Sequence, residues 1–143
     1  MKKLQKIQKE LKAPKNQFNK FGGYKHRNTE GILEAVKPLM EEDCLVTMSD
    51  EIVMIGSRYY NKSTVTWEEP NYTKSVTGFA REEESKKGMD GSQITGAACS
   101  YARKYALGGL FLIDDTKDAD ATNTGDTQAT PKDNPFDDAY IPE

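Results

Sequence analysis

The chain has 143 residues, of which 36% are apolar and 30% are charged. This length suits one folded domain with extensions and is short for two domains. No apolar run approaches the roughly 20 residues of a membrane-spanning helix, and we expect no signal peptide. Cys44 and Cys99 are the only cysteines, and His26 is the only histidine. We therefore expect no structural zinc site, no membrane association, and thiols that serve as small core residues in the cytoplasm.

The net charge of −3 conceals two unequal parts of the chain. Residues 1–113 hold 18 basic and 14 acidic side chains, a net +4, whereas residues 114–143 hold 2 and 9, a net −7. Basic bodies with acidic tails are common among nucleic-acid proteins, where the tail competes for the basic surface or recruits partners. A solvated charged helix followed by a disordered end is the alternative interpretation of the same charges.

The start of the chain predicts a short basic helix. Leu4, Ile7 and Leu11 have the spacing of one helix face, and lysines cover the other faces. Pro14 ends the pattern. Residues 1–15 are therefore expected to form an N-terminal helical segment.

A loop and a second helix are expected next. Residues 16–23 form the loop, because they end in a flexible pair of glycines. A helix of about 13 residues then begins at a cap provided by Asn28 or Thr29. Pro38 falls late in this helix and bends or tightens its last turn. The apolar face of the helix comprises Ile32, Leu33, Val36, Leu39 and Met40.

The middle of the chain predicts a sheet. Four segments are rich in β-branched and aromatic side chains, and short polar breaks separate them. The segments are residues 44–48, 52–60, 63–68 and 72–81, and the breaks include Ser49-Asp50, Asn61-Lys62 and Pro70-Asn71. Because such breaks are too short for helical crossovers, we expect an antiparallel meander of three or four strands.

A helix over residues 92–109 carries the strongest pattern. Ile94, Ala98, Tyr101 and Tyr105 recur at helical spacing and form one apolar stripe. Four small residues in succession, 96–99, predict that another element approaches the helix backbone closely, and packing on the sheet or on a helix explains them.

Two adjacent cations lie late in the same helix. One basic residue would satisfy the helix dipole, so the pair Arg103 and Lys104 beside aromatic rings indicates a track for phosphates. Basic residues elsewhere would extend it: Lys25, Arg27, Arg58, Lys62 and Lys74. Exposed strand lysines also serve solubility in any protein, which is the alternative interpretation of the sheet cations.

No catalytic arrangement competes with this interpretation. Ser100 lacks a base nearby, and the acidic run from Asp114 to Asp120 lacks the glycine turn of a calcium loop. We expect no enzyme activity, no metal site and no cofactor. Residues 114–143 contain almost no core-forming side chains and are predicted to be disordered.

Two segments together resemble the Erf (essential recombination function) family of phage single-strand annealing proteins. They are NKFGGYKHRNTEGILEAVKPLM at 19–40 and GSQITGAACSYARKYALGGLFLIDDTKDAD at 91–120. The resemblance implies an α+β fold with a β-β-β-α core over residues 16–113, in which a three- to four-stranded antiparallel sheet packs with helices. His26, Cys99 and Gly108 differ from the residues common in the family at these positions.

The resemblance also implies a function. It predicts ATP-independent binding of single-stranded DNA and annealing of complementary strands in phage recombination, by a homo-oligomeric ring or helical filament in the bacterial cytoplasm. Arg103, Lys104 and Tyr105 match the family's Tyr-Ala-Arg-(Arg or Lys)-Tyr motif, while Lys25 and Arg27 match its aromatic-basic segment. The acidic tail is a candidate docking segment for host or phage replication proteins. A protein-interaction module, or a protein that binds single strands without annealing them, are the alternatives.

Overall fold

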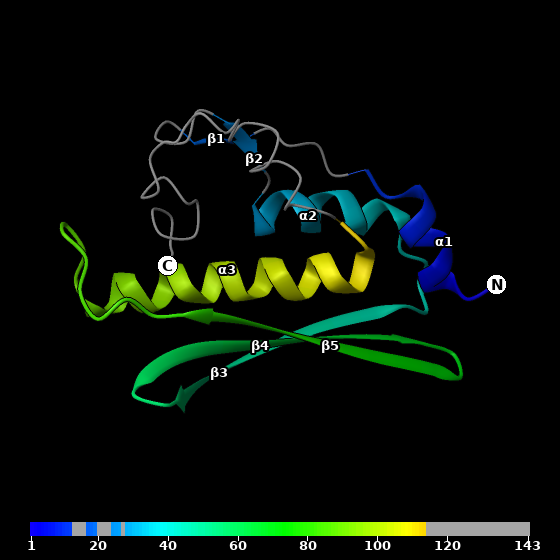
Figure 1. Cartoon of the computed structure of the whole chain (residues 1–143). Coiled ribbons are helices and arrows are strands. Elements are labelled where there is room, and N and C mark those ends of the chain that lie inside the picture. Colours follow the sequence, from blue (N-terminus) through cyan, green and yellow to red (C-terminus); the bar gives the residue numbers. More distant parts are fainter. Residues whose placement is uncertain (13–16, 20–23, 27, 114–143) are drawn as a thin grey trace, which may run out of the picture.

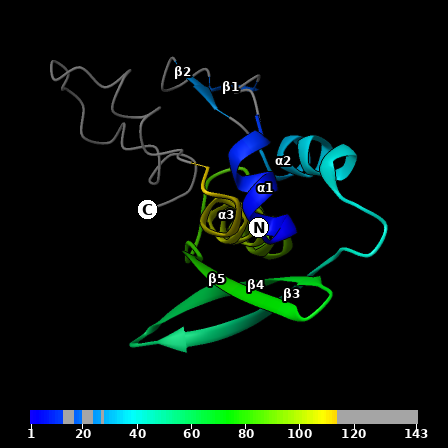
Figure 2. The same ribbon diagram turned by 90° about the vertical axis from the view of Figure 1, so that its right-hand side faces the viewer.

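The computed structural model describes residues 1–12, 17–19, 24–26 and 28–113. Its elements form three layers (Figure 1). A three-stranded sheet is crossed on one face by the long helix α3 (Gly91–Phe111), and α2 (Thr29–Val36) lies on the far side of α3. Figure 2 shows the same layers end-on, with α1 (Lys3–Glu10) crossing above one end of α3. The α+β class is confirmed.

The sheet is an antiparallel meander in the order β3-β4-β5, as predicted. Its strands are β3 (Leu45–Ile55), β4 (Arg58–Glu69) and β5 (Tyr72–Arg81). The turn at Pro70-Asn71 is confirmed, and Asn71 adopts φ +64° there. The predicted breaks at Ser49-Asp50 and Asn61-Lys62 are wrong, because these pairs continue β3 and β4 in register. The chain instead turns at Gly56, whose φ of +63° favours glycine.

Helix α3 buries only part of the predicted stripe, since Ile94 and Ala98 are buried as predicted but the two tyrosines are not. Its buried residues on the sheet side include Ile94, Ala98, Ala102, Ala106 and Leu110, whereas Tyr101 and Tyr105 are only partly buried.

The cause is a close approach between α3 and β5. A β-carbon added to Gly78 would lie 2.5 Å from the carbonyl oxygen of Ala102 and 2.7 Å from the amide nitrogen of Ala106. Only alanines fit in that gap, so the tyrosines lie beside it. The close contact predicted at residues 96–99 is wrong at Gly96, which is exposed and where a β-carbon would meet no atom within 4 Å.

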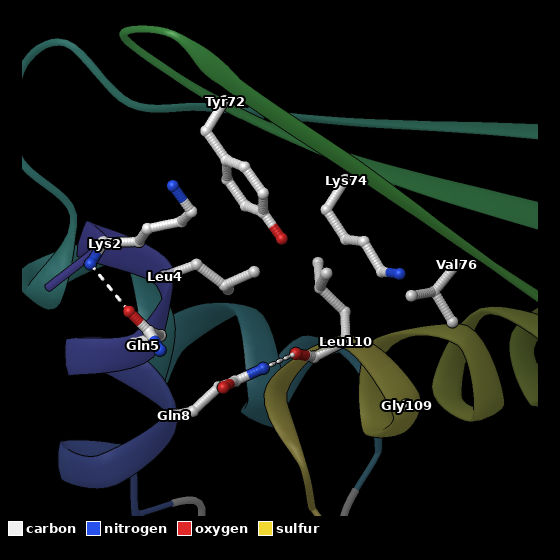
Figure 3. A pocket seen from close by; sticks show the side chains of 9 residues that line it. All are labelled: Lys2, Leu4, Gln5, Gln8, Tyr72, Lys74, Val76, Gly109 and Leu110. Carbon is white, nitrogen blue, oxygen red and sulfur yellow. Dashed lines mark hydrogen bonds between the residues drawn. The ribbon is translucent and has the colours of Figure 1, made fainter.

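The N-terminal helix completes the core. Leu4 and Ile7 of α1 are buried in the cluster that contains Trp67 and Phe111. The two aromatic rings meet edge to face, with centroids 6.1 Å apart. The Gln8 side chain donates to the Leu110 carbonyl oxygen at 2.7 Å, which fastens α1 to the end of α3 (Figure 3).

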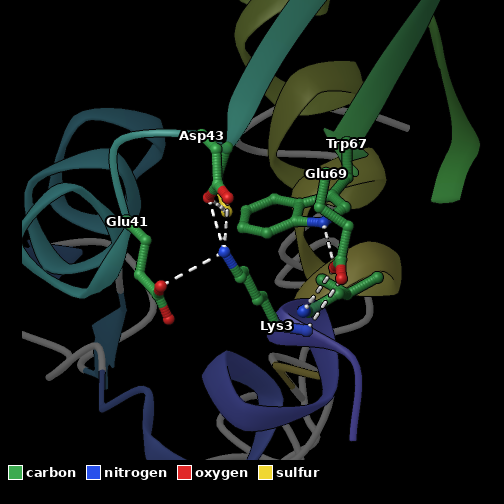
Figure 4. A network of polar contacts seen from close by, with 7 residues as sticks. Lys3, Glu41, Asp43, Trp67 and Glu69 are labelled. Carbon is green, nitrogen blue, oxygen red and sulfur yellow. Dashed lines mark hydrogen bonds and ion pairs between the residues drawn. The ribbon is translucent and has the colours of Figure 1, made fainter. Parts of the chain in front are cut away.

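A single carboxylate joins α1 to the sheet. Glu69 of β4 accepts from the backbone amides of Lys3 and Leu4, both at 2.9 Å, and from Trp67 Nε1 at 2.8 Å (Figure 4). Burial by itself would raise the pKa of Glu69, but these hydrogen bonds and the charge of Lys2 outweigh it and lower the pKa. An anion at the first turn of a helix also satisfies donors that have no partner within the helix.

The predictions for residues 16–40 are partly confirmed. Asn28 caps α2 by accepting from the Gly31 amide at 2.8 Å. The helix is shorter than predicted, because a 3₁₀ turn (Lys37–Leu39) containing Pro38 follows Val36. Part of the expected loop is a strand, since β1 (Gln17–Asn19) pairs antiparallel with β2 (Tyr24–His26). Residues 114–143 lie outside the described residues, so their predicted disorder stays a prediction.

None of the helices in the described part of the chain has the length and apolar character of a membrane span.

The approach at Gly78 leads to a stability prediction. We expect Gly78→Ala to lower the free energy of unfolding by about 1–3 kcal/mol, because the new methyl group forces α3 away from β5. Urea unfolding followed by circular dichroism measures this. Gly96→Ala is the matched control in α3, and it should stabilise by about 0.5–1 kcal/mol through helix propensity. Equal effects of the two substitutions would contradict the packing described here.

The Glu69 contacts lead to a second prediction. Glu69→Gln should lower the free energy of unfolding at pH 7 by roughly 1 kcal/mol, because the amide removes the charge from three hydrogen bonds. Since the pKa of Glu69 is lowered on folding, its contribution is present above the unfolded value and is lost as the pH falls below about 4. The difference between variant and wild type should therefore shrink as the pH falls from 7 to 3. The neighbour Glu68, which points to the opposite face, provides the control Glu68→Gln.

Candidate nucleic-acid interface

An open cleft lies where the start of α2 meets the middle of α3. It encloses about 270 Å³ and is lined by Asn28, Thr29, Glu30, Gly96, Cys99, Ser100 and Arg103. The Thr29 hydroxyl donates to the Ser100 carbonyl oxygen at 3.2 Å and ties the two helices together. Because Gly96 has no side chain, the backbone of α3 forms part of the wall.

Arg103 is held in place by the sheet. Its Nη2 lies 2.6 Å from Asp50 Oδ2, and its Nε lies 3.1 Å from the same oxygen. Asp50 projects from β3 on the helix side of the sheet and also accepts from the hydroxyl of Ser63. The Arg103 guanidinium has five N–H donors, and it contacts Asp50 through Nε and Nη2. Nη1 does not donate to Asp50.

The protonation states of this cluster follow from the pair. The hydrogen bonds from Arg103, together with the one from Ser63, lower the pKa of Asp50 in spite of its partial burial. The same contacts raise the pKa of Arg103. Burial raises the pKa of the Cys99 thiol, so it is the unreactive thiol form at neutral pH.

This arrangement can accept an anion. The first turn of α2 presents the positive end of a helix dipole to the cleft, and Arg103 adds a guanidinium whose orientation is set by Asp50. Glu30 opposes an anion at the rim, and Asp50 offsets the charge of Arg103. A guanidinium and a helix N-terminus of this kind can bind a phosphate group here.

The other two residues of the predicted helical motif face elsewhere. Adjacent residues of a helix point about 100° apart, so Lys104 does not share the direction of Arg103. The Lys104 amine lies 5.2 Å from the centroid of the Tyr101 ring, a cation–π contact. Tyr105 packs beside Gly78 of β5, on the flank of α3 away from Asp50.

The three predicted sheet cations are not brought together with Arg103. Lys62 alternates with the buried residues of β4, so it lies on the face without helices, 3.5 Å from Glu51. Arg58 lies near the β3–β4 turn and donates to the Glu82 carbonyl oxygen at 3.0 Å. Lys74 lies at the other end of α3, in a separate pocket beside α1.

Two further predicted residues precede α2. Lys25 belongs to β2, but its side chain lies outside the described part of the chain, and Arg27 lies outside it altogether. Their assignment to DNA binding stays a prediction.

Sequence reasoning missed the residues that support Arg103. Asp50 and Ser63 were expected in or next to breaks between strands, and Thr29 only as a helix cap. The signal was present in the alternation along β3, where Met48, Asp50 and Ile52 share a face. A carboxylate at such an inward position requires a cationic partner from the element that covers the sheet.

Within the described ranges, no group of histidine, cysteine, aspartate or glutamate side chains could hold a metal ion. The acidic run from Asp114 lies outside these ranges.

The family model of the ERF superfamily matches residues 1–140. The chain belongs to the ERF superfamily. Among its relatives is the essential recombination function protein of Salmonella phage P22, which is 58% identical over 118 residues. The match covers 82% of this chain and 57% of that relative, so the ERF chain spans little more than half of the relative's length. No solved structure matches.

The Asp50–Arg103 pair of this ERF chain leads to a third prediction. Asp50→Asn should lower the free energy of unfolding at pH 7 by roughly 1 kcal/mol. The effect is this small because the Arg103 side chain is 36% exposed and water screens the ion pair. Since folding lowers the pKa of Asp50, its contribution is present above about pH 4 and is lost as the pH falls through the folded value. Thermal unfolding from pH 3 to pH 7 measures this. A difference from wild type that stays constant over this range would argue against the pair.

Proposed function

We propose that this protein binds single-stranded DNA and anneals complementary strands without ATP, in phage homologous recombination in the host cytoplasm. The observation that carries the proposal is the Arg103 cleft, which provides a fixed guanidinium and a helix N-terminus. Membership of the ERF superfamily and the name of the phage P22 relative, a recombination protein, support the same function.

The mechanism follows from what the cleft can contact. Arg103 would donate to phosphate oxygens through the edge of the guanidinium that Asp50 does not use, while Asp50 acts as a positioning residue. The Thr29 and Ser100 backbones would lie alongside the strand. Contacts to phosphates leave base edges exposed, so that a second strand can pair with them, and they carry little sequence preference.

The other predicted basic residues would contact DNA only beyond the cleft. Lys104 and Tyr105 lie on other sides of α3, and Lys62 and Arg58 lie on or near the uncovered face of the sheet. A strand that reached all of them would need to pass around the helix or across neighbouring copies. A ring or filament of copies provides such a path, and we include this assembly in the proposal.

The surface of the hairpin supports assembly. Four large apolar side chains of the β3–β4 hairpin are about half exposed, and β3 is an edge strand with unpaired backbone groups on one side. They are Ile52, Met54, Ile55 and Tyr59. The acidic tail, residues 114–143, remains the candidate site for replication proteins of the phage or host.

The decisive experiment compares Arg103→Ala with Lys87→Ala, which removes an equal charge from an exposed loop position. We expect Arg103→Ala to weaken binding to an unstructured oligonucleotide by about tenfold and to slow annealing in a fluorescence assay. The slope of log K against log salt should become shallower by about 0.7, since one phosphate contact is lost. Arg103→Lys, which cannot form the same fork, should fall between the two.

The alternatives give different results. Wild-type affinity and annealing rate in Arg103→Ala would exclude the cleft as the DNA site. Absence of salt-dependent DNA binding in the wild type would indicate a protein-interaction module instead. Strong binding without faster pairing of complementary strands would indicate a single-strand-binding protein that does not anneal.

A further inference from the structure

A second pocket lies on the opposite flank of α3 from the Arg103 cleft. It encloses about 290 Å³ between α1, the start of β5 and the last turn of α3 (Figure 3). Leu4 and Leu110, which are 4% and 1% exposed, contribute apolar side chains to its lining. The pocket therefore offers an apolar surface at the end of the helix layer, and it does not belong to the cleft described above.

The rim of this pocket is cationic and aromatic. Lys2 and Lys74 lie on either side of the Tyr72 ring in Figure 3, and the Lys2 amine is 4.5 Å from the ring centroid. The described lining contains these two amines and no acidic side chain. An apolar floor with two amines at the rim fits a peptide in which an aromatic side chain is followed by carboxylates.

The chain carries such a peptide close by. Ile113 donates its amide to the Gly108 carbonyl oxygen at 2.9 Å, so the described chain stops next to the last turn of α3. Phe136 is the first large apolar residue after Ile113, and Asp137 and Asp138 follow it directly. The 23 residues from Ile113 to Phe136 can span up to roughly 75 Å, far more than the width of one domain.

From these observations we propose that residues 135–141 dock in this pocket of their own chain. The Phe136 ring would lie between Leu4 and Leu110, and the carboxylates of Asp137 and Asp138 would pair with Lys2 and Lys74. Attachment at Ile113 keeps the segment at a high effective concentration near the pocket, which a separate peptide would lack. Residues 114–143 carry a net charge of −7 and residues 1–113 a net charge of +4, so electrostatic attraction also favours this docking.

Zero-length carbodiimide coupling of the full chain tests the docking. The reagent joins a carboxylate to an amine only where the two are in contact, and mass spectrometry of peptides locates each amide formed. We expect Asp137 and Asp138 to couple to Lys2 and Lys74 in preference to Lys87. The ion pair between Lys3 and Asp43, 2.6 Å apart, provides an internal standard for the folded protein.

Three variants sharpen the test. Phe136→Ser should lower the initial rate of this coupling at least tenfold, since the aromatic ring no longer holds the segment, while the Lys3–Asp43 product is unchanged. Lys74→Glu should lower coupling to Lys2 severalfold, and Lys87→Glu, the same charge change at an exposed loop, should not. In a mixture of ¹⁴N and ¹⁵N protein, each coupled product should join two peptides that carry the same nitrogen isotope, because the tail docks in its own chain.

Three outcomes would overturn the proposal. Equal coupling in Phe136→Ser and the wild type would show that the ring does not enter the pocket. Products that join the two isotopes would assign the occupant to a second copy of the chain. Protection of Lys2 and Lys74 from acetylation by single-stranded DNA, with no tail coupling, would assign the pocket to DNA. None of these measurements depends on annealing, so the docking and the proposed function can fail separately.

Discussion

The closeness of α3 to β5 is the constraint on which the arrangement of this protein depends. Gly78 leaves no room for a β-carbon beneath Ala102 and Ala106, so the helix backbone rests almost directly on the strand. Dispersion contacts at this distance are numerous, and any larger side chain would separate the layers. Trp67 and Phe111 can then meet at the end of the same interface, and α1 closes the core over them.

This contact also sets the rotation of α3 about its axis. With Ala102 and Ala106 against the sheet, Arg103 is turned toward β3 and Tyr105 toward β5. The Asp50 carboxylate pairs with Arg103, whereas the Lys104 amine lies over the Tyr101 ring, so the two adjacent cations of α3 have different partners. Arg103 is consequently a structural residue as well as the main candidate for contact with DNA, and the proposed contact uses the edge of the guanidinium that Asp50 leaves open.

The charges of the chain are arranged in the same divided way. One cationic site lies between α2 and α3 and is partly neutralised by Asp50, while another surrounds Tyr72 at the opposite end of the helix. A polyanion bound at the first site would not cover the second. In the two proposals made here, the acidic tail and a DNA strand use separate surfaces of the protein and do not compete for a single groove.

The sequence by itself determined the family, the class of fold, the order of the three helices and the antiparallel meander, and a helix cap at Asn28 or Thr29, but not the strands β1 and β2. These features depend on local periodicity and on long motifs, both of which are visible in a linear chain. Two of the three predicted strand breaks were wrong because Asp50 and Asn61 are polar in a way typical of turns, and only their partners across the sheet explain them.

Tertiary structure alone decided which face of α3 is buried and which basic residues lie together. Tyr101 and Tyr105 have larger aromatic side chains than Ala102 and Ala106, so the helical pattern favoured the tyrosines for the second half of the buried stripe. The gap left by Gly78, far away in the sequence, selected the small side chains instead. Contacts between distant segments are decided by the space available, and a pattern of hydrophobicity along one helix does not contain that information.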